Sequence, residues 1–177
     1  MSGKGLASRA FALLATKTTV WTRAVKYSVL SNNLVIGDPL RLQPVLVLGA
    51  GLIKVGQNVR IGYCPSPHFF STYAHLEARA GEALIEIGDG TQINNGFVAI
   101  AEKSSIAIGV NCLIGTLCEI YDSDFHALTK AGRESGQAHQ CRPVVIEDDV
   151  LHRKQCPHPQ RRKDWSRLSN RKLVRCY

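Results

Sequence analysis

A histidine preceded by two aspartates is the chain's clearest candidate for acid–base chemistry. His126 ends the segment DSDFH, in which Asp122 and Asp124 come four and two residues earlier. An imidazole titrates near neutral pH, so it can remove the proton from a hydroxyl group that is otherwise a poor nucleophile. If the segment is a strand, alternation places the three side chains on one face, where either carboxylate could orient the imidazole or support its charged form. Ser123 lies in no nucleophile-elbow motif, so we expect no serine nucleophile.

An aliphatic residue recurs at every sixth position before this histidine. Ile87 is followed by Ile93, and Ile108 by Ile114 and Ile120, and most of these residues precede Gly or Asn. The spacing is typical of the hexapeptide repeat of a parallel β-helix, with one short strand per six residues and three strands per coil. Each aliphatic side chain points inward, and the small residue after it fits the corner, where Gly and Asn tolerate positive φ. The sequence therefore predicts an all-β fold.

The repeat spans residues 32–150 and is interrupted by a short loop at residues 64–68 and by a longer segment at residues 122–142. It begins imperfectly around Val35, continues through Val55 and Ile61, and resumes with Ile146 as an inward residue. Between these, residues 122–142 carry glycines and polar side chains that break the period. We interpret them as an excursion loop that leaves the β-helix, with His126 near the point where the last regular coil ends.

Residues 1–31 predict an amphipathic, basic helical segment, for which three interpretations stay open. The helix could pack over the end of the β-helix and shield its first coil. It could instead make a peripheral contact with an anionic membrane leaflet, with Trp21 and Tyr27 available for that interface. A cleaved signal peptide is the third, but Lys17 interrupts the apolar region that such a peptide needs.

Charge and cysteine content exclude several classes of protein. The formal net charge of +8 resides in residues 151–177, because the thirteen basic and thirteen acidic residues of 1–150 cancel. We therefore expect no nucleic-acid partner. The six cysteines include no CxxC pair, which argues against a metal site and for a reducing, cytoplasmic location. Cys112 and Cys118 are expected to fill the core as small apolar residues.

Residues 151–177 form a basic tail that matches no helical or strand pattern. The register of Ile146 predicts inward residues at His152, His158, Asp164 and Asn170. If the reading frame is shifted by one nucleotide, the codons at all four positions can encode Ile. In the same shifted frame, the single codon for Trp165, which follows Asp164, forces a Gly. We therefore expect the tail to be out of frame, so that the coils end early.

The segment IEIGDGTQINNGFVAIAEKSSIAIGVNCLIGTLCEIYDSDFH, followed by a loop and RPVVIEDDV, resembles the hexapeptide-repeat O-acetyltransferases, which include galactoside and maltose acetyltransferases. The resemblance covers roughly residues 34–150. It implies a left-handed parallel β-helix, a homotrimer with active sites between subunits, acetyl-CoA as acyl donor and a saccharide acceptor in cell-surface polysaccharide biosynthesis. In relatives, later coils form most of the coenzyme A groove, so we expect this chain to bind it poorly.

The resemblance also implies roles for individual residues. His126 matches the catalytic base, with Asp124 beside it. Asn95, in the segment INNG, matches an asparagine that touches the acceptor and the tetrahedral intermediate, where an amide can donate to a developing oxyanion. Asn95 could also be a corner residue, and Asn94 could exchange roles with it. We place Asn94, Glu102 and Asp122 among the substrate-binding residues.

Three other functions compete with O-acetylation. The same base could serve N-acetylation of an amino sugar or a nucleotide-sugar. A non-catalytic, truncated β-helix that only trimerises is a different class. A γ-type carbonic anhydrase needs three zinc-binding histidines with a close pair, but His126 and His139 are thirteen residues apart and His75 is remote. We therefore expect no metal.

Overall fold

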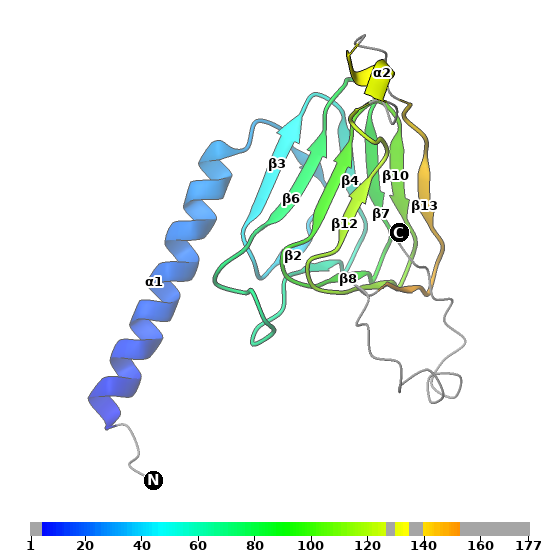
Figure 1. Ribbon diagram of the computed structural model, residues 1–177. Coiled ribbons are helices and arrows are strands. Elements are labelled where there is room, and N and C mark those ends of the chain that lie inside the picture. Colours follow the sequence, from blue (N-terminus) through cyan, green and yellow to red (C-terminus); the bar gives the residue numbers. More distant parts are fainter. Residues whose placement is uncertain (1–4, 127–129, 135–139, 153–177) are drawn as a thin grey trace, which may run out of the picture.

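A long helix and a column of short parallel strands make up the protein in a computed structural model, which describes residues 5–126, 130–134 and 140–152. Figure 1 shows the helix α1 (Leu6–Leu30) leading into the column. The first coils contain β1 (Val35–Ile36), β2 (Leu40–Arg41), β3 (Val45–Gly49), β4 (Leu52–Val55), β5 (Arg60–Ile61) and β6 (Ala74–Ala78). The later coils contain β7 (Leu84–Ile87), β8 (Gln92–Ile93), β9 (Val98–Ala101), β10 (Ser105–Ile108), β11 (Leu113–Ile114), β12 (Glu119–Tyr121), β13 (Val144–Ile146) and β14 (Leu151–His152).

The chain visits three parallel sheets in turn. Sheet A has the order β1-β4-β7-β10-β13, sheet B the order β2-β5-β8-β11-β14 and sheet C the order β3-β6-β9-β12. Each strand pairs in parallel with the strands three places before and after it in the chain. This is the arrangement of a parallel β-helix. It confirms the parallel β-helix that the six-residue spacing predicts.

The predicted inward residues form the core. Ile87, Ile93, Ile108, Ile114, Ile120 and Ile146 are all buried, and so are Cys112 and Cys118. Three strands of sheet A, β4, β7 and β10, also bury a second residue, as where Ile85 and Ile106 alternate with the outward Glu86 and Ala107. The sequence repeat had indicated one inward residue per strand, and strand alternation supplies the other.

Corners between strands use close backbone approach and left-handed residues. A Cβ added to Gly88 would lie 2.6 Å from the backbone of Gly109 in the next coil, so no side chain fits there. Asn111 has a φ of 55°, which Asn tolerates better than most residues. Gly88 directly follows the inward Ile87 and therefore fits the corner as expected from the sequence. The left-handed Asn111 lies three residues after the inward Ile108, at a different corner position.

The helix α1 is continuous, and its described side-chain contacts with the β-helix lie in its C-terminal half. It contains no Gly or Pro and is rich in Ala and Leu, which favours helix. The Tyr27 ring stacks on Tyr73 with centroids 4.3 Å apart, and the Arg23 guanidinium donates to the carbonyls of Phe69 and Thr72. Tyr27 is thus not available for an interface, contrary to the expectation. Ile36 of the first coil stays exposed.

The excursion begins and ends at neighbouring points. Ser123 and Cys141 form an isolated antiparallel bridge, and the Arg142 amide donates to the Asp122 carbonyl at 2.7 Å. A short helix, α2 (Lys130–Glu134), lies between them at the top of Figure 1. Residues 127–129 and 135–139 of the predicted excursion, and the tail 153–177, lie outside the described residues.

Candidate functional site

His126 and Asp124 follow the end of β12 and are both exposed. Strand β12 ends at Tyr121, and Phe125 has a φ of 57°, so the segment turns instead of continuing as a strand. The prediction that Asp122, Asp124 and His126 share one strand face is therefore wrong. Within the described part of the chain, no side chain hydrogen-bonds to the His126 imidazole or to the Asp124 carboxylate. Both groups are accessible to a ligand.

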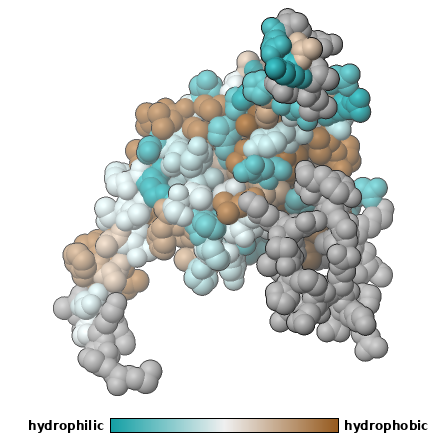
Figure 2. Space-filling view, viewed as in Figure 1, coloured by the Kyte–Doolittle hydropathy of each residue, from teal (hydrophilic) through white to brown (hydrophobic). Residues whose placement is uncertain are grey.

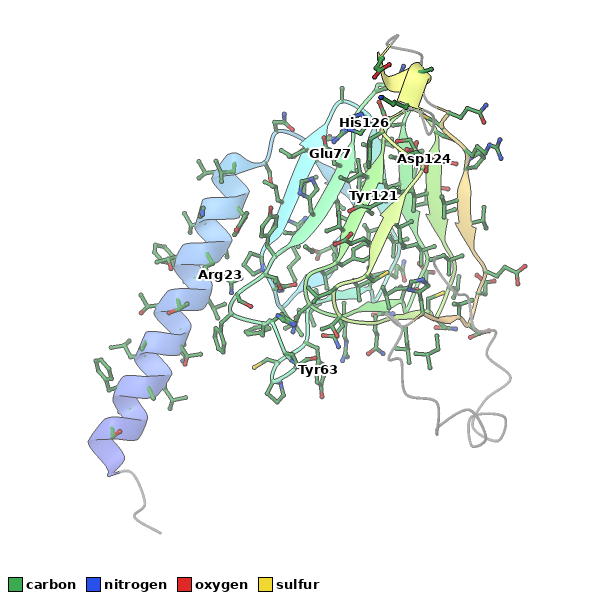
Figure 3. The ribbon with its side chains drawn as sticks, viewed as in Figure 1. Arg23, Tyr63, Glu77, Tyr121, Asp124 and His126 are labelled. Atoms are coloured by element: carbon green, nitrogen blue, oxygen red, sulfur yellow. The ribbon has the colours of Figure 1, made fainter. Side chains whose placement is uncertain are left out.

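Phe125 fixes this turn against the outer face of sheet C. Its ring packs edge-on against Tyr121 with centroids 5.3 Å apart, and the Arg79 guanidinium lies 4.9 Å from the ring centroid. Figure 3 shows His126, Asp124, Tyr121 and Glu77 at the same end of this sheet. His126 is therefore held next to a charged cluster on β6.

That cluster, made of His75, Glu77 and Arg79, was not identified from the sequence. Glu77 accepts hydrogen bonds from Arg79 Nε at 2.8 Å and pairs with His75 Nε2 at 3.0 Å. Burial acts to raise the pKa of the Glu77 carboxyl, but the hydrogen bonds from Arg79 and His75 outweigh it and lower that pKa. The three residues alternate with the buried Ala and Leu of β6. This i, i+2, i+4 spacing is the signal that could have revealed them.

Asp122 is buried, and its carboxylate braces the corner after β9. It accepts backbone hydrogen bonds from Glu102 at 2.8 Å, Lys103 at 3.2 Å and Ser104 at 2.7 Å. Glu102, half-buried, accepts a hydrogen bond from the Ser123 hydroxyl at 2.8 Å. The two carboxylates thus tie the start of the excursion to sheet C. Both had been expected to bind substrate, and in this chain both have protein partners.

Asn95 is fully buried, and the loop that follows β5 occupies its amide. Its Oδ1 accepts from the Tyr63 amide at 3.0 Å, and its Nδ2 lies within hydrogen-bond distance of the carbonyls of Tyr63, Ser66 and Pro67. Asn94 is half-buried, and its Oδ1 accepts from the Asn95 amide at 2.8 Å. Among described residues, nothing accepts a hydrogen bond from Asn94 Nδ2. Asn94 is therefore the amide with a free donor.

The asparagines and the histidine do not meet within one chain. Asn94 and Asn95 precede β9, whereas His126 follows the far end of β12 in the same sheet. Figure 3 shows Tyr63, which Asn95 holds, at the end of the molecule opposite His126. The predicted site residues therefore form two separate groups.

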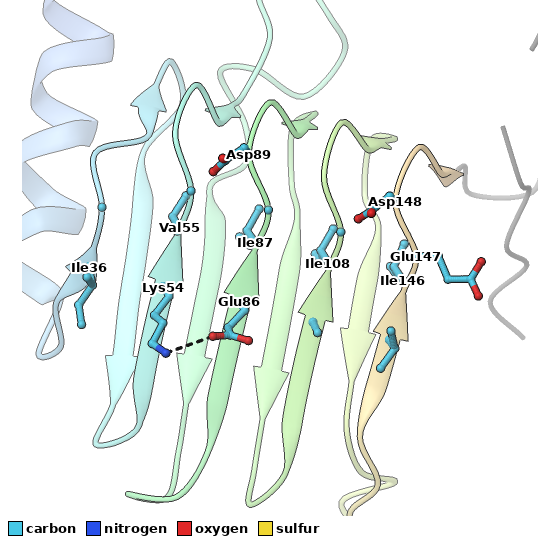
Figure 4. Close-up of a pocket in the computed structure, with 16 residues that line it drawn as sticks. Ile36, Lys54, Val55, Glu86, Ile87, Asp89, Ile108, Ile146, Glu147 and Asp148 are labelled. Atoms are coloured by element: carbon cyan, nitrogen blue, oxygen red, sulfur yellow. Dashed lines mark hydrogen bonds and ion pairs between the residues drawn. The ribbon is translucent and has the colours of Figure 1, made fainter. Parts of the chain in front are cut away.

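Two depressions lie beside β13. A hollow of about 340 Å³ is lined by Tyr121, Asp122, Ser123, Asp124, Gln140, Arg142, Pro143 and Val144. A groove of about 670 Å³ runs across sheet A from Ile36 to Asp148 (Figure 4). Among the described residues that line the groove, the cation is Lys54, whose Nζ lies 3.2 Å from Glu86 Oε1. The groove also contains Asp89 and Glu147. These residues do not fit the phosphates of coenzyme A, because negative charge outweighs positive charge there.

The described residues contain no group of three or more His, Cys, Asp or Glu side chains that could hold a metal ion. Within the same ranges, no helix has the length and apolar character required to cross a membrane. Comparison with protein-family models, with curated proteins and with solved structures found no match to this chain.

Proposed function

We propose that this protein is an acyltransferase built on a left-handed β-helix, which moves an acetyl group from acetyl-CoA to a hydroxyl of a saccharide. The observation that carries the proposal is the exposed His126 imidazole, which has no partner in the described chain. It comes two residues after Asp124, which lines the hollow. Sequence resemblance supplies the reaction, and the free imidazole supplies the group that the reaction needs.

In this proposal His126 is the general base. Its imidazole takes the proton of the acceptor hydroxyl as the oxygen attacks the thioester carbonyl carbon. The tetrahedral intermediate then collapses with cleavage of the C–S bond, and the imidazolium returns the proton to the departing coenzyme A thiolate. Asp124, two residues earlier, supports the imidazolium that results. The hollow beside Asp124 is the acceptor site, since its lining of carboxylate, amide and guanidinium groups can hydrogen-bond sugar hydroxyls.

The separation of the two groups of residues favours a site between subunits. In a homotrimer, Asn94 of one subunit can approach His126 of the next, and its unpaired Nδ2 then donates to the developing oxyanion. Asn95 supports this amide indirectly, by holding the loop after β5 in place. Phosphate-binding residues for the donor would also come from outside the described groove.

The test is acetyl transfer by the full chain. Purified protein is incubated with acetyl-CoA and a panel of saccharides, and released thiol and acetylated product are measured. His126→Asn should lower the rate by roughly 100-fold or more, which is the usual contribution of a general base. His68→Asn is the matched control, because His68 is also exposed and lies in the loop after β5. No product with any acceptor, or equal rates for the two variants, would contradict the proposal.

A further inference from the structure

The helix α1 carries a stripe of exposed apolar side chains that the β-helix does not cover. Phe11, Leu14, Trp21, Val25 and Val29 are all exposed. At 100° per residue they fall within one arc of roughly 80°. Figure 2 shows hydrophobic side chains on the part of the helix that projects from the body. We call these five residues the apolar stripe.

The stripe faces away from the body because the opposite side of α1 is anchored. Val20, Arg23 and Tyr27 are the half-buried residues on that side. Arg23 donates to the carbonyls of Phe69 and Thr72, and Tyr27 stacks on Tyr73. After the helix, the Ser31 hydroxyl accepts from the Val47 amide at 2.9 Å. The helix is thus fixed with the stripe turned outward.

Two threonine hydroxyl groups beside the stripe are already satisfied by the helix backbone. Thr18 lies on the same arc, and its hydroxyl donates to the Leu14 carbonyl at 2.9 Å. Thr22, at the edge of the arc, donates to the Thr18 carbonyl at 3.0 Å. A threonine that bonds back to its own helix presents its methyl group outward and adds little cost when water is removed. The surface is therefore suited to an apolar environment.

The charged residues beside the apolar stripe indicate what kind of partner the stripe contacts. Residues 1–37 contain no Asp or Glu, whereas Lys17 and Lys26 lie on either side of the stripe and are exposed. In a helix pair formed by two copies of α1, no carboxylate of either helix would face these lysines. Anionic lipid headgroups match them, and Trp21 in the middle of the stripe is of the residue type enriched at the membrane–water boundary.

We propose that α1 lies flat on an anionic lipid bilayer, with the apolar stripe in the boundary between headgroups and acyl chains and Lys17 and Lys26 against the phosphates. The inference does not depend on the proposed acetyl transfer. It places the β-helix beside a membrane surface, held by its N-terminal helix.

The test is co-sedimentation of the full chain with vesicles. We expect binding to vesicles that contain phosphatidylglycerol, weaker binding in high salt, and little binding to phosphatidylcholine alone. The variant Leu14→Gln/Trp21→Gln should bind about tenfold more weakly or worse, because two apolar anchors are lost. Leu13→Gln is the matched control: Leu13 and Leu14 are each 64% exposed, but Leu13 lies outside the stripe.

Three results would overturn the proposal. The first is absence of binding to anionic vesicles. The second is a loss of vesicle binding in Leu13→Gln equal to that in Leu14→Gln/Trp21→Gln. The third is a lower solution mass for Leu14→Gln/Trp21→Gln than for the wild type. The last would show that the stripe joins copies of the chain. Circular dichroism of each variant checks that the helix is retained.

Discussion

At the scale of single residues, two carboxylates two positions apart have opposite surroundings. Asp122 is buried and accepts three backbone hydrogen bonds from residues 102–104, whereas Asp124 is exposed and has no side-chain partner in the described structure. A buried carboxylate with this many partners stabilises the fold, and an exposed one is free to act on a ligand.

This contrast predicts different effects for the same substitution. Asp122→Ala should lower the free energy of unfolding by about 3 kcal/mol, because it leaves buried amides without acceptors. Asp124→Ala should change it by less than about 0.5 kcal/mol, as is usual at the surface, while lowering acetyl transfer. Urea unfolding measures the stabilities. Equal losses of stability would show that the corner after β9 does not depend on Asp122.

Asn94 and Asn95 also differ in whether protein partners already use their side-chain amides. Asn95 uses its amide to hold the loop after β5, and Asn94 keeps a donor free. The alternative noted from the sequence, that Asn95 is structural and Asn94 takes the functional role, is the one that the hydrogen bonds favour. Sequence alone left this open, because adjacent residues in one corner look equivalent.

At the scale of elements, the last described strand contains a polar residue in an apolar position. His152 of β14 pairs with Ile114 of β11, is buried, and lies 3.1 Å from the Cys118 thiol through Nδ1. The hexapeptide register predicts an inward residue here, and the structure confirms that position. Desolvation by burial lowers the pKa of the His152 imidazole below 6.5.

The lowered pKa makes stability depend on pH. As pH falls below about 6.5, the unfolded chain takes up a proton at His152 that the folded chain does not. The free energy of unfolding should therefore fall between this pH and the lower folded-state pKa. His152→Ile should remove that loss and raise stability by about 1 kcal/mol at neutral pH, since an aliphatic side chain continues the stack.

Urea unfolding at several pH values measures the effect, with His126→Ala as the control because His126 is exposed. An unchanged pH dependence in His152→Ile would mean that another group is responsible. A gain in stability would also agree with the expected shift of reading frame, under which position 152 can encode Ile.

At the scale of the whole molecule, assembly decides whether the proposed site can form. Asn94 and His126 lie at opposite ends of sheet C, and Ile36 and Val145 are exposed on the outer face of sheet A. In the proposed homotrimer, association of the β-helices would bury such apolar side chains and bring the two groups of residues together.

Light scattering after size exclusion should give three times the 19.4 kDa of one chain. Leu14→Gln/Trp21→Gln should keep this mass, because we place the subunit contacts on the β-helix and the membrane contact on α1. A monomer at all concentrations would contradict the trimer and leave the asparagines without a role at His126.

The sequence by itself determined the repeat, the inward residues, the N-terminal helix and the candidate base. These depend on local spacing, since one aliphatic residue in six and the small residue after it specify each strand and corner. Only the tertiary structure decided which polar groups are already satisfied. The partners of Asp122 come from residues 102–104, those of Asn95 from residues 63–67, and Glu77 joins His75 and Arg79. Most of these contacts join neighbouring coils, and the number of residues per coil varies with the loops between strands. No sequence period specifies which side chains such coils bring together.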